Sequence, residues 1–212
     1  MADCCCTATP LNLDPQRERA YRRVLWVVLA INAAMFAVEI GAGVVAGSTS
    51  LQADALDFLG DAANYAISLA VVGTALRYRA NAALVKGASM GLFGAWVIGT
   101  AVWHALHGTL PNAVAMGAIG VTALIANGCS FALLWSHRSG DANMRSAWVC
   151  TRNDVLGNLA VLAAALGVFG TGSGWPDILV AAVMASLALQ GAFVIVRQSL
   201  GELRLHRAAP AE

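Results

Sequence analysis

Long apolar segments alternate with short polar stretches along the whole chain. The run from Gly87 to Ser136 contains no Asp, Glu, Lys or Arg. One membrane-spanning helix needs about 20 apolar residues, so this run must fold back on itself, and Gly108, Pro111 and Asn112 mark the turn. The other apolar segments, interpreted in the same way, bring the prediction to six membrane-spanning helices. Their expected bounds are 24–46, 51–76, 84–106, 113–136, 144–170 and 178–196.

The composition agrees with a membrane protein. Hydrophobic residues make up 58% of the chain and charged residues only 12%, with a mean hydropathy of +0.67. A soluble domain has about 45–50% apolar and about 25% charged residues, so the composition excludes a water-soluble globular enzyme and a disordered protein. The net charge of +1 offers no basic face to phosphates and so excludes a nucleic-acid binder. The predicted fold class is all-α, a polytopic membrane protein with six transmembrane helices.

The basic residues indicate how these helices are oriented. Twelve of the thirteen Lys and Arg residues lie before the first helix, in or next to the second and fourth connections, or after the last helix. The positive-inside rule puts these parts in the cytoplasm, so we expect cytoplasmic termini and a multi-pass protein of the inner (cytoplasmic) membrane. Arg152, in the fifth helix, is the exception. We expect an N-terminal tail with a Cys triplet (1–22), a six-helix membrane domain (23–198) and a short C-terminal tail (199–212).

Acidic residues inside the predicted helices are the main candidates for chemistry. An ionisable group at membrane depth is costly and usually marks a pathway or a paired site. Asp57 and Asp61 in the second helix are four residues apart, so their carboxylates share one helical face. Cys150 and Asp154 repeat this spacing in the fifth helix. If the two helices face each other, three oxygens and one sulfur could bind one metal ion with the tetrahedral geometry of zinc sites.

Two further acids inside the predicted helices have a less specific pattern. Asp54 lies about one turn before Asp57, and we expect it to support the site or pack against a helix rather than bind the ion. Glu39 in the first helix could carry protons, or it could be a structural partner of Asn32 or of the second helix. Both are therefore secondary candidates for a metal or proton pathway.

Two groups of metal-binding residue types lie outside the helix interiors. Cys4, Cys5 and Cys6 are adjacent and could capture a soft metal ion, although they lack the spacing of a zinc knuckle, and a tail without function is the alternative. His104 and His107 lie at the end of the third helix. They could form a weak metal site, but filling of the membrane interface is the favoured interpretation.

The second and fifth helices resemble those of a known family. Residues 50–61 (SLQADALDFLGD) and 143–158 (NMRSAWVCTRNDVLGN) resemble the second- and fifth-helix signatures of cation diffusion facilitators. The resemblance implies a six-helix, proton-coupled exporter of divalent transition metals, with its transport site between helices 2 and 5. Cys150 stands where the family usually has His or Asp. Members commonly end in a cytoplasmic ferredoxin-like domain, so this sequence is expected to be a short form without it.

The ligand types narrow the expected cargo. A thiolate favours Zn²⁺ and Cd²⁺, with Co²⁺ and Ni²⁺ open, whereas Mn²⁺ or Fe²⁺ would fit if Cys150 is not a ligand. Protons compete for the same ligands, since carboxylates and thiols bind metal only when deprotonated, which indicates metal/proton antiport. A metal-binding receptor or assembly factor without transport is the alternative, and an intramembrane aspartyl protease fits poorly because two acids share one helix. We expect no enzyme activity and no organic cofactor, and the sequence leaves a homodimer open.

Overall fold

In the computed structural model, residues 15–71, 76–135 and 142–208 are described, and the side chains at several helix ends, including those of residues 142–153, are not. Within these ranges the chain forms six α-helices and no strand, as the hydropathy pattern predicts. They are α1 (Pro15–Ala46), α2 (Thr49–Val71), α3 (Leu76–His107), α4 (Ala113–Trp135), α5 (Ala142–Thr171) and α6 (Trp175–Ala208).

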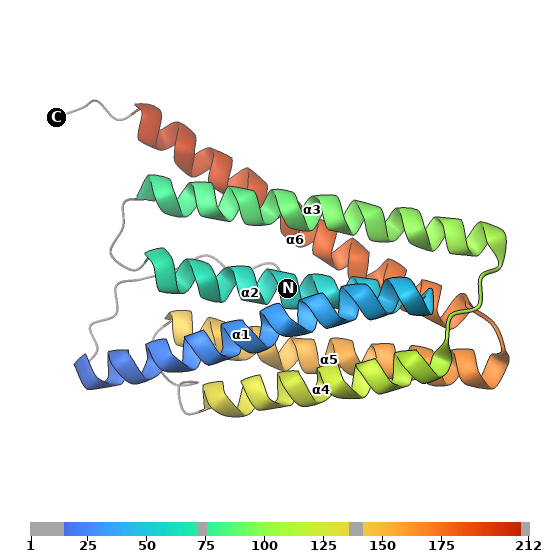
Figure 1. Ribbon diagram of the computed structural model, residues 1–212. Helices are drawn as coiled ribbons and strands as arrows, with labels where there is room; N and C mark the ends of the chain where they lie inside the picture. Colours follow the sequence, from blue (N-terminus) through green and yellow to red (C-terminus); the bar gives the residue numbers. More distant parts are fainter. Residues whose placement is uncertain (1–14, 72–75, 136–141, 209–212) are drawn as a thin grey trace.

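The helices lie side by side in one elongated bundle, with the start of α1 and the end of α6 at the same end (Figure 1). Helix α2 is central, because it packs against each of the other five helices. Around it, α3 packs mainly on α6, and α4 packs mainly on α5. Every residue from Leu51 to Leu56 is buried. Of the three aspartates of α2, Asp54 and Asp61 are buried and Asp57 is half-buried, so protein rather than lipid surrounds most of this acidic group, as the cost of charge in a bilayer requires.

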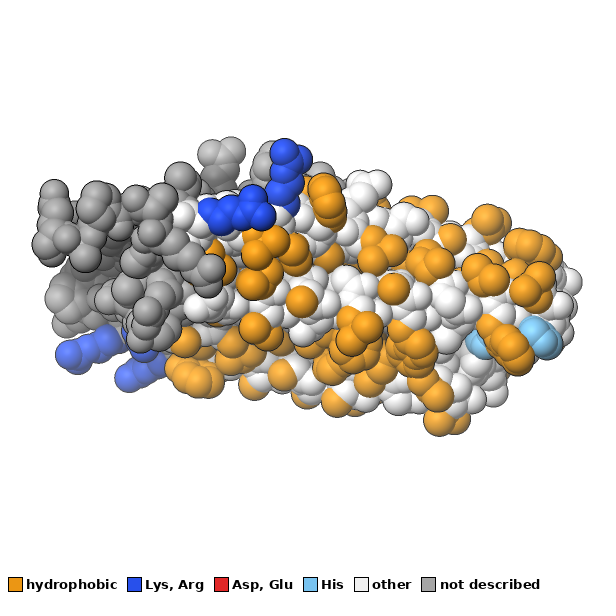
Figure 2. Space-filling view, turned by 90° about the horizontal axis from the view of Figure 1, so that it is seen from above, with side chains coloured by type: hydrophobic (Ala, Val, Ile, Leu, Met, Phe, Trp, Pro, Cys, Tyr) orange, Lys and Arg blue, Asp and Glu red, His pale blue; other side chains and the backbone are white. Residues whose placement is uncertain are grey.

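The other five helices are long and apolar enough to cross a membrane, and α2 is not among them. Its three aspartates lower its hydropathy. Because α2 packs against the other five helices, these aspartates avoid most of the energetic cost of facing lipid. The outer surface of the bundle is apolar: Val45, Leu106 and Phe169, for example, are 90%, 78% and 77% exposed. Hydrophobic side chains are spread over the face shown in Figure 2. Such continuous apolar exposure marks a lipid-facing surface, and the protein is a multi-pass membrane protein.

Several helices extend beyond the predicted bounds. Helix α1 begins at Pro15 rather than 24, and α6 continues to Ala208 rather than ending at 196. The second connection was predicted too late in the chain, because α2 ends at Val71 and Leu76 already begins α3. All of these extensions carry Arg residues. A helix can continue past the hydrocarbon layer where its side chains reach water and lipid head groups, so hydropathy underestimates its length.

The two ends of the bundle differ in chemistry. Described Lys and Arg side chains gather toward one end, and His side chains lie at the other (Figure 2). At the His end, the three connections each contain a glycine with positive φ: Gly47 (64°), Gly108 (63°) and Gly172 (63°). Glycine adopts this conformation without steric cost and so ends a helix abruptly. We call this end, with its three turns, the glycine end.

Candidate metal-transport site

The first half of the site is a face of α2. Asp57 and Asp61 lie one turn apart on this helix, and their carboxyl groups interact electrostatically. Asp61 is buried, and its Oδ2 accepts a hydrogen bond of 3.2 Å from the hydroxyl of Tyr65. Asp57 is half-buried. Tyr65 thus orients one of the two carboxylates from one turn further along the same helix.

The second half comes from α5. The carboxyl of Asp154 interacts electrostatically first with Asp61, and then with Asp57 and Asp54. Its Oδ2 atom is buried and has no hydrogen-bond partner in the described part of the chain. The fold therefore brings Asp154 of α5 within electrostatic range of Asp61 and Asp57 of α2, although these residues lie about ninety positions apart in sequence.

The complete ligand set stays a prediction. Cys150 lies on α5 one turn before Asp154, but its side chain, like that of Arg152, is outside the described residues. Among the side chains that are described, no group of three or more His, Cys, Asp or Glu is arranged to hold a metal ion. Cys4, Cys5 and Cys6 also lie outside the described residues.

A glycine determines how closely α5 approaches α2. A β-carbon at Gly157 would lie 3.6 Å from Oδ2 of Asp57 and 3.7 Å from Oδ1 of Asp54. The backbone of α5 thus lies directly against the two carboxylates, and only hydrogen separates them at this position. This contact places Gly157 in the wall of the site.

A chain of buried polar side chains links Asp54 to two other helices. Asn158 of α5 donates its amide to both oxygens of Asp54, at 3.1 and 2.8 Å. The side-chain amide of Asn127 on α4 in turn donates to the side-chain oxygen Oδ1 of Asn158 at 3.1 Å. All three side chains are buried, so this network joins α2, α5 and α4 beside the ligands. Asn127 is not singled out in the sequence analysis. The feature that could have identified it is its polar amide side chain within a long segment without charged residues.

Glu39 of α1 faces the same network. It is fully buried, and neither carboxyl oxygen has a hydrogen-bond partner among the described residues. Its strongest interaction with another charged group is with Asp54, followed by Asp57. Asn32, one of the partners that the sequence suggests for Glu39, donates instead to the backbone carbonyl of Val28 on its own helix, at 2.8 Å. The carboxyl of Glu39 therefore belongs to the α2 acid group.

Lys86 is a basic residue that the sequence assigns to the region of the second connection, between the second and third helices. It lies inside α3 and is buried, with its ammonium group donating to the side-chain oxygen of Asn64 on α2. Asn64 follows Asp61 by three residues, so Lys86 approaches α2 about one turn beyond the ligands. This contact also fixes α3 against α2.

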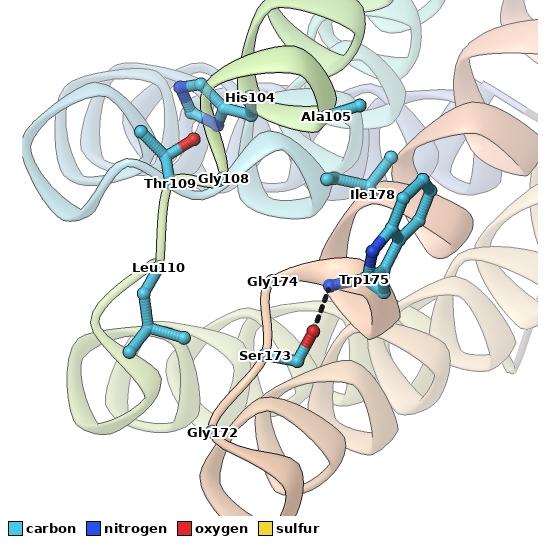
Figure 3. A pocket seen from close by; sticks show the side chains of 10 residues that line it. All are labelled: His104, Ala105, Gly108, Thr109, Leu110, Gly172, Ser173, Gly174, Trp175 and Ile178. Atoms are coloured by element: carbon cyan, nitrogen blue, oxygen red, sulfur yellow. Dashed lines mark hydrogen bonds between the residues drawn. The ribbon is translucent and has the colours of Figure 1, made fainter.

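A cavity of about 180 Å³ lies apart from the carboxylates, at the glycine end. The α3–α4 and α5–α6 turns line it, with His104 on one side and Trp175 on the other (Figure 3). His107 does not line this cavity; its ring stacks on Trp103 with 3.7 Å between ring centroids. The two histidines therefore do not converge on one point of the cavity wall.

These features define a class: a helical membrane protein whose central helix carries buried carboxylates opposite another carboxylate, an arrangement suited to a cation. The sequence model of one protein family, the cation efflux transmembrane domain, matches residues 25–204 of the chain. The chain belongs to the cation efflux family.

Individual relatives agree with this membership. The chain is 26% identical to the metal cation efflux system protein CzcD of Cupriavidus metallidurans over 193 residues, which cover 85% of this chain and 61% of CzcD. It is 30% identical to the zinc transporter ZitB of Escherichia coli over 200 residues, 86% of this chain and 62% of ZitB. A cadmium, cobalt and zinc/H⁺-K⁺ antiporter of Bacillus subtilis is 23% identical over 201 residues, 86% of this chain and 63% of the antiporter. The chain thus spans about three fifths of the length of these relatives.

Proposed function

We propose that this protein exports divalent transition-metal cations from the cytoplasm across the inner membrane, with Zn²⁺ and Cd²⁺ as the main cargo and protons moving in the opposite direction. The observation that carries the proposal is the approach of Asp154 on α5 to Asp57 and Asp61 on α2. The relatives named for zinc, cadmium and cobalt transport support the choice of cargo. In this proposal the protein is a transporter rather than an enzyme.

The ligand chemistry supplies the coupling. Carboxylates and a thiol bind a cation only after losing their protons, so metal and protons compete for Asp57, Asp61, Cys150 and Asp154. If the site opens alternately to the two sides, protons entering from outside displace the metal there. The metal leaves, and the site returns to the cytoplasmic side in its protonated form. An inward proton gradient then drives metal outward.

Cys150 decides the range of ions in this proposal. A thiolate is a soft ligand that suits Zn²⁺ and Cd²⁺ and disfavours Mg²⁺ and Ca²⁺. Three carboxylates without the thiol suit Mn²⁺ or Fe²⁺ better. The Cys150→Ala variant therefore tests selectivity separately from transport.

The test is metal uptake into proteoliposomes with an imposed pH gradient, comparing Zn²⁺, Cd²⁺, Co²⁺ and Mn²⁺. We expect wild-type protein to move Zn²⁺ or Cd²⁺ against protons and Asp57→Asn to abolish uptake. Ser186→Ala serves as the control, because Ser186 is exposed and, among the described residues, its hydroxyl bonds only to the carbonyl of Ala182 within α6. Metal binding without uptake by wild type would contradict transport and favour the metal-binding receptor. Uptake that is unchanged after collapse of the pH gradient would contradict antiport.

A further inference from the structure

The carboxylate of Asp177 joins the first turn of α6 to the start of α2. It is 1% exposed. Its Oδ1 accepts hydrogen bonds from the Ser48 hydroxyl at 2.7 Å and from the Ser50 amide at 3.0 Å. Its Oδ2 accepts from the Thr49 amide at 2.7 Å and the Thr49 hydroxyl at 2.8 Å. Four donors from one helix start thus converge on a single buried carboxylate of another helix.

The local chemistry explains why this contact is strong. The first amides of any helix have no partner within that helix, and the N-terminal end carries a partial positive charge. Asp177 satisfies two such amides of α2 with a full negative charge, from outside the helix. Hydrogen bonds to a charged acceptor are roughly twice as strong as neutral ones, and burial excludes water that could replace them.

The remaining turns at the glycine end are also packed together. The Asn112 amide donates to the carbonyl of Ala46 at 2.9 Å, which joins the α3–α4 turn to the end of α1. A β-carbon at Gly174 would lie 2.4 Å from the carbonyl oxygen of Thr109, so the α5–α6 turn lies directly against the α3–α4 turn. Each connection at this end therefore contacts another, with Asp177 making the charged link.

The Asp177 contact lies at the start of α2, about two to three helical turns from the predicted metal ligands on the same helix. Asp57 and Asp61 follow Thr49 by eight and twelve residues, which is about 12 and 18 Å along a helix. A rotation of α2 by about 10° around its start would move these carboxylates by about 2–3 Å. That displacement is comparable to a metal–oxygen bond length. A fixed contact at the glycine end therefore suffices for a small rotation to assemble or disperse the ligands.

We propose that Asp177, with Ser48, Thr49 and Ser50, forms a pivot that stays closed throughout the transport cycle and makes α2 and α6 move together. Its proposed effect on transport rests on the proposed function. The pivot positions the α2 ligands and does not contact the cargo. The alternative is a latch, a contact that opens in every transport cycle. The two possibilities predict opposite changes in the turnover rate when the contact is weakened. Weakening a latch leaves turnover unchanged or raises it, whereas weakening a pivot lowers it.

The experiment measures Zn²⁺ uptake kinetics and Zn²⁺ binding for wild type, Asp177→Asn, Ser48→Ala and the control Ser186→Ala. For the pivot, Asp177→Asn lowers the maximal rate at least tenfold, with Zn²⁺ affinity within about threefold of wild type. Ser48→Ala removes one of the four bonds to Asp177, together with the bond that the Ser48 hydroxyl accepts from the Leu51 amide. This variant has an intermediate rate and covers the case in which Asp177→Asn does not fold. A wild-type or higher maximal rate in the folded variants overturns the pivot. A merely structural role would lower the folded amount without changing the rate per folded molecule.

A second measurement does not depend on transport. Hydrogen–deuterium exchange of wild-type protein in nanodiscs, with EDTA or with Zn²⁺, reports on the amides of Thr49 and Ser50. The pivot requires slow exchange of both amides in both conditions, and fast exchange in either one overturns it. A wild-type protein that binds Zn²⁺ but moves none refutes the proposed function, and the exchange data then decide separately whether the contact stays closed.

Discussion

Gly157 offers a direct test of how closely α5 must approach the α2 carboxylates. A β-carbon there would lie 3.4 Å from Cε of Met184 and 3.6 Å from Oδ2 of Asp57, which are ordinary contact distances. Alanine therefore fits without movement. Valine adds methyl groups about 1.5 Å further out, and in a helix it is held largely in one rotamer. A methyl carbon would then reach within about 2–3 Å of an atom in the site unless α5 moves away by about 1 Å.

This difference gives matched variants with opposite expectations. A displacement of about 1 Å in a binding constellation costs about 100-fold in function, so Gly157→Val should lose about 100-fold in Zn²⁺ uptake rate, whereas Gly157→Ala should stay within about threefold. Gly128→Val on α4 is the control, because no described atom beyond the adjoining backbone of α4 lies within 4 Å of a β-carbon at that position. Zn²⁺ titration calorimetry and proteoliposome uptake measure both effects. Folded Gly157→Val protein with wild-type affinity and rate would refute the proposed closeness of the two helices at the site.

Two more outcomes follow from the polar groups. Replacing Asn158 by Ala removes both hydrogen bonds to the buried Asp54 carboxylate, so thermal unfolding in detergent should show a loss of about 1–3 kcal/mol; an unchanged midpoint would mean that water substitutes for the amide. Because protons compete with the cation for deprotonated ligands, the Zn²⁺ dissociation constant should rise as pH falls, by up to about tenfold per pH unit for each proton displaced. Calorimetry in buffers of different ionisation enthalpy counts those protons, and a pH-independent affinity would exclude shared ligands.

The presence of six helices and their apolar character could be predicted from the amino-acid sequence. Each span must satisfy its own backbone hydrogen bonds in lipid, so a run of apolar residues is enough to locate five of the helices, whereas α2 falls short because of its aspartates. The spacing of Asp57 and Asp61 is also a local property of one helix. The bilayer makes such acids costly wherever they are placed, which is why they stand out in the sequence. The ends of the helices could not be predicted as well, because several helices continue beyond the residues at which the apolar pattern stops.

The contacts between side chains of different helices could not be predicted in this way. No sequence pattern states that α2 lies at the centre, that Asn127 reaches Asn158 on another helix, or that Asp177 satisfies the first amides of α2. These contacts depend on the rotation and neighbours of each helix, which side-chain packing sets across the whole bundle. Periodicity identifies the polar face of a helix, but only packing chooses the helix that this face meets.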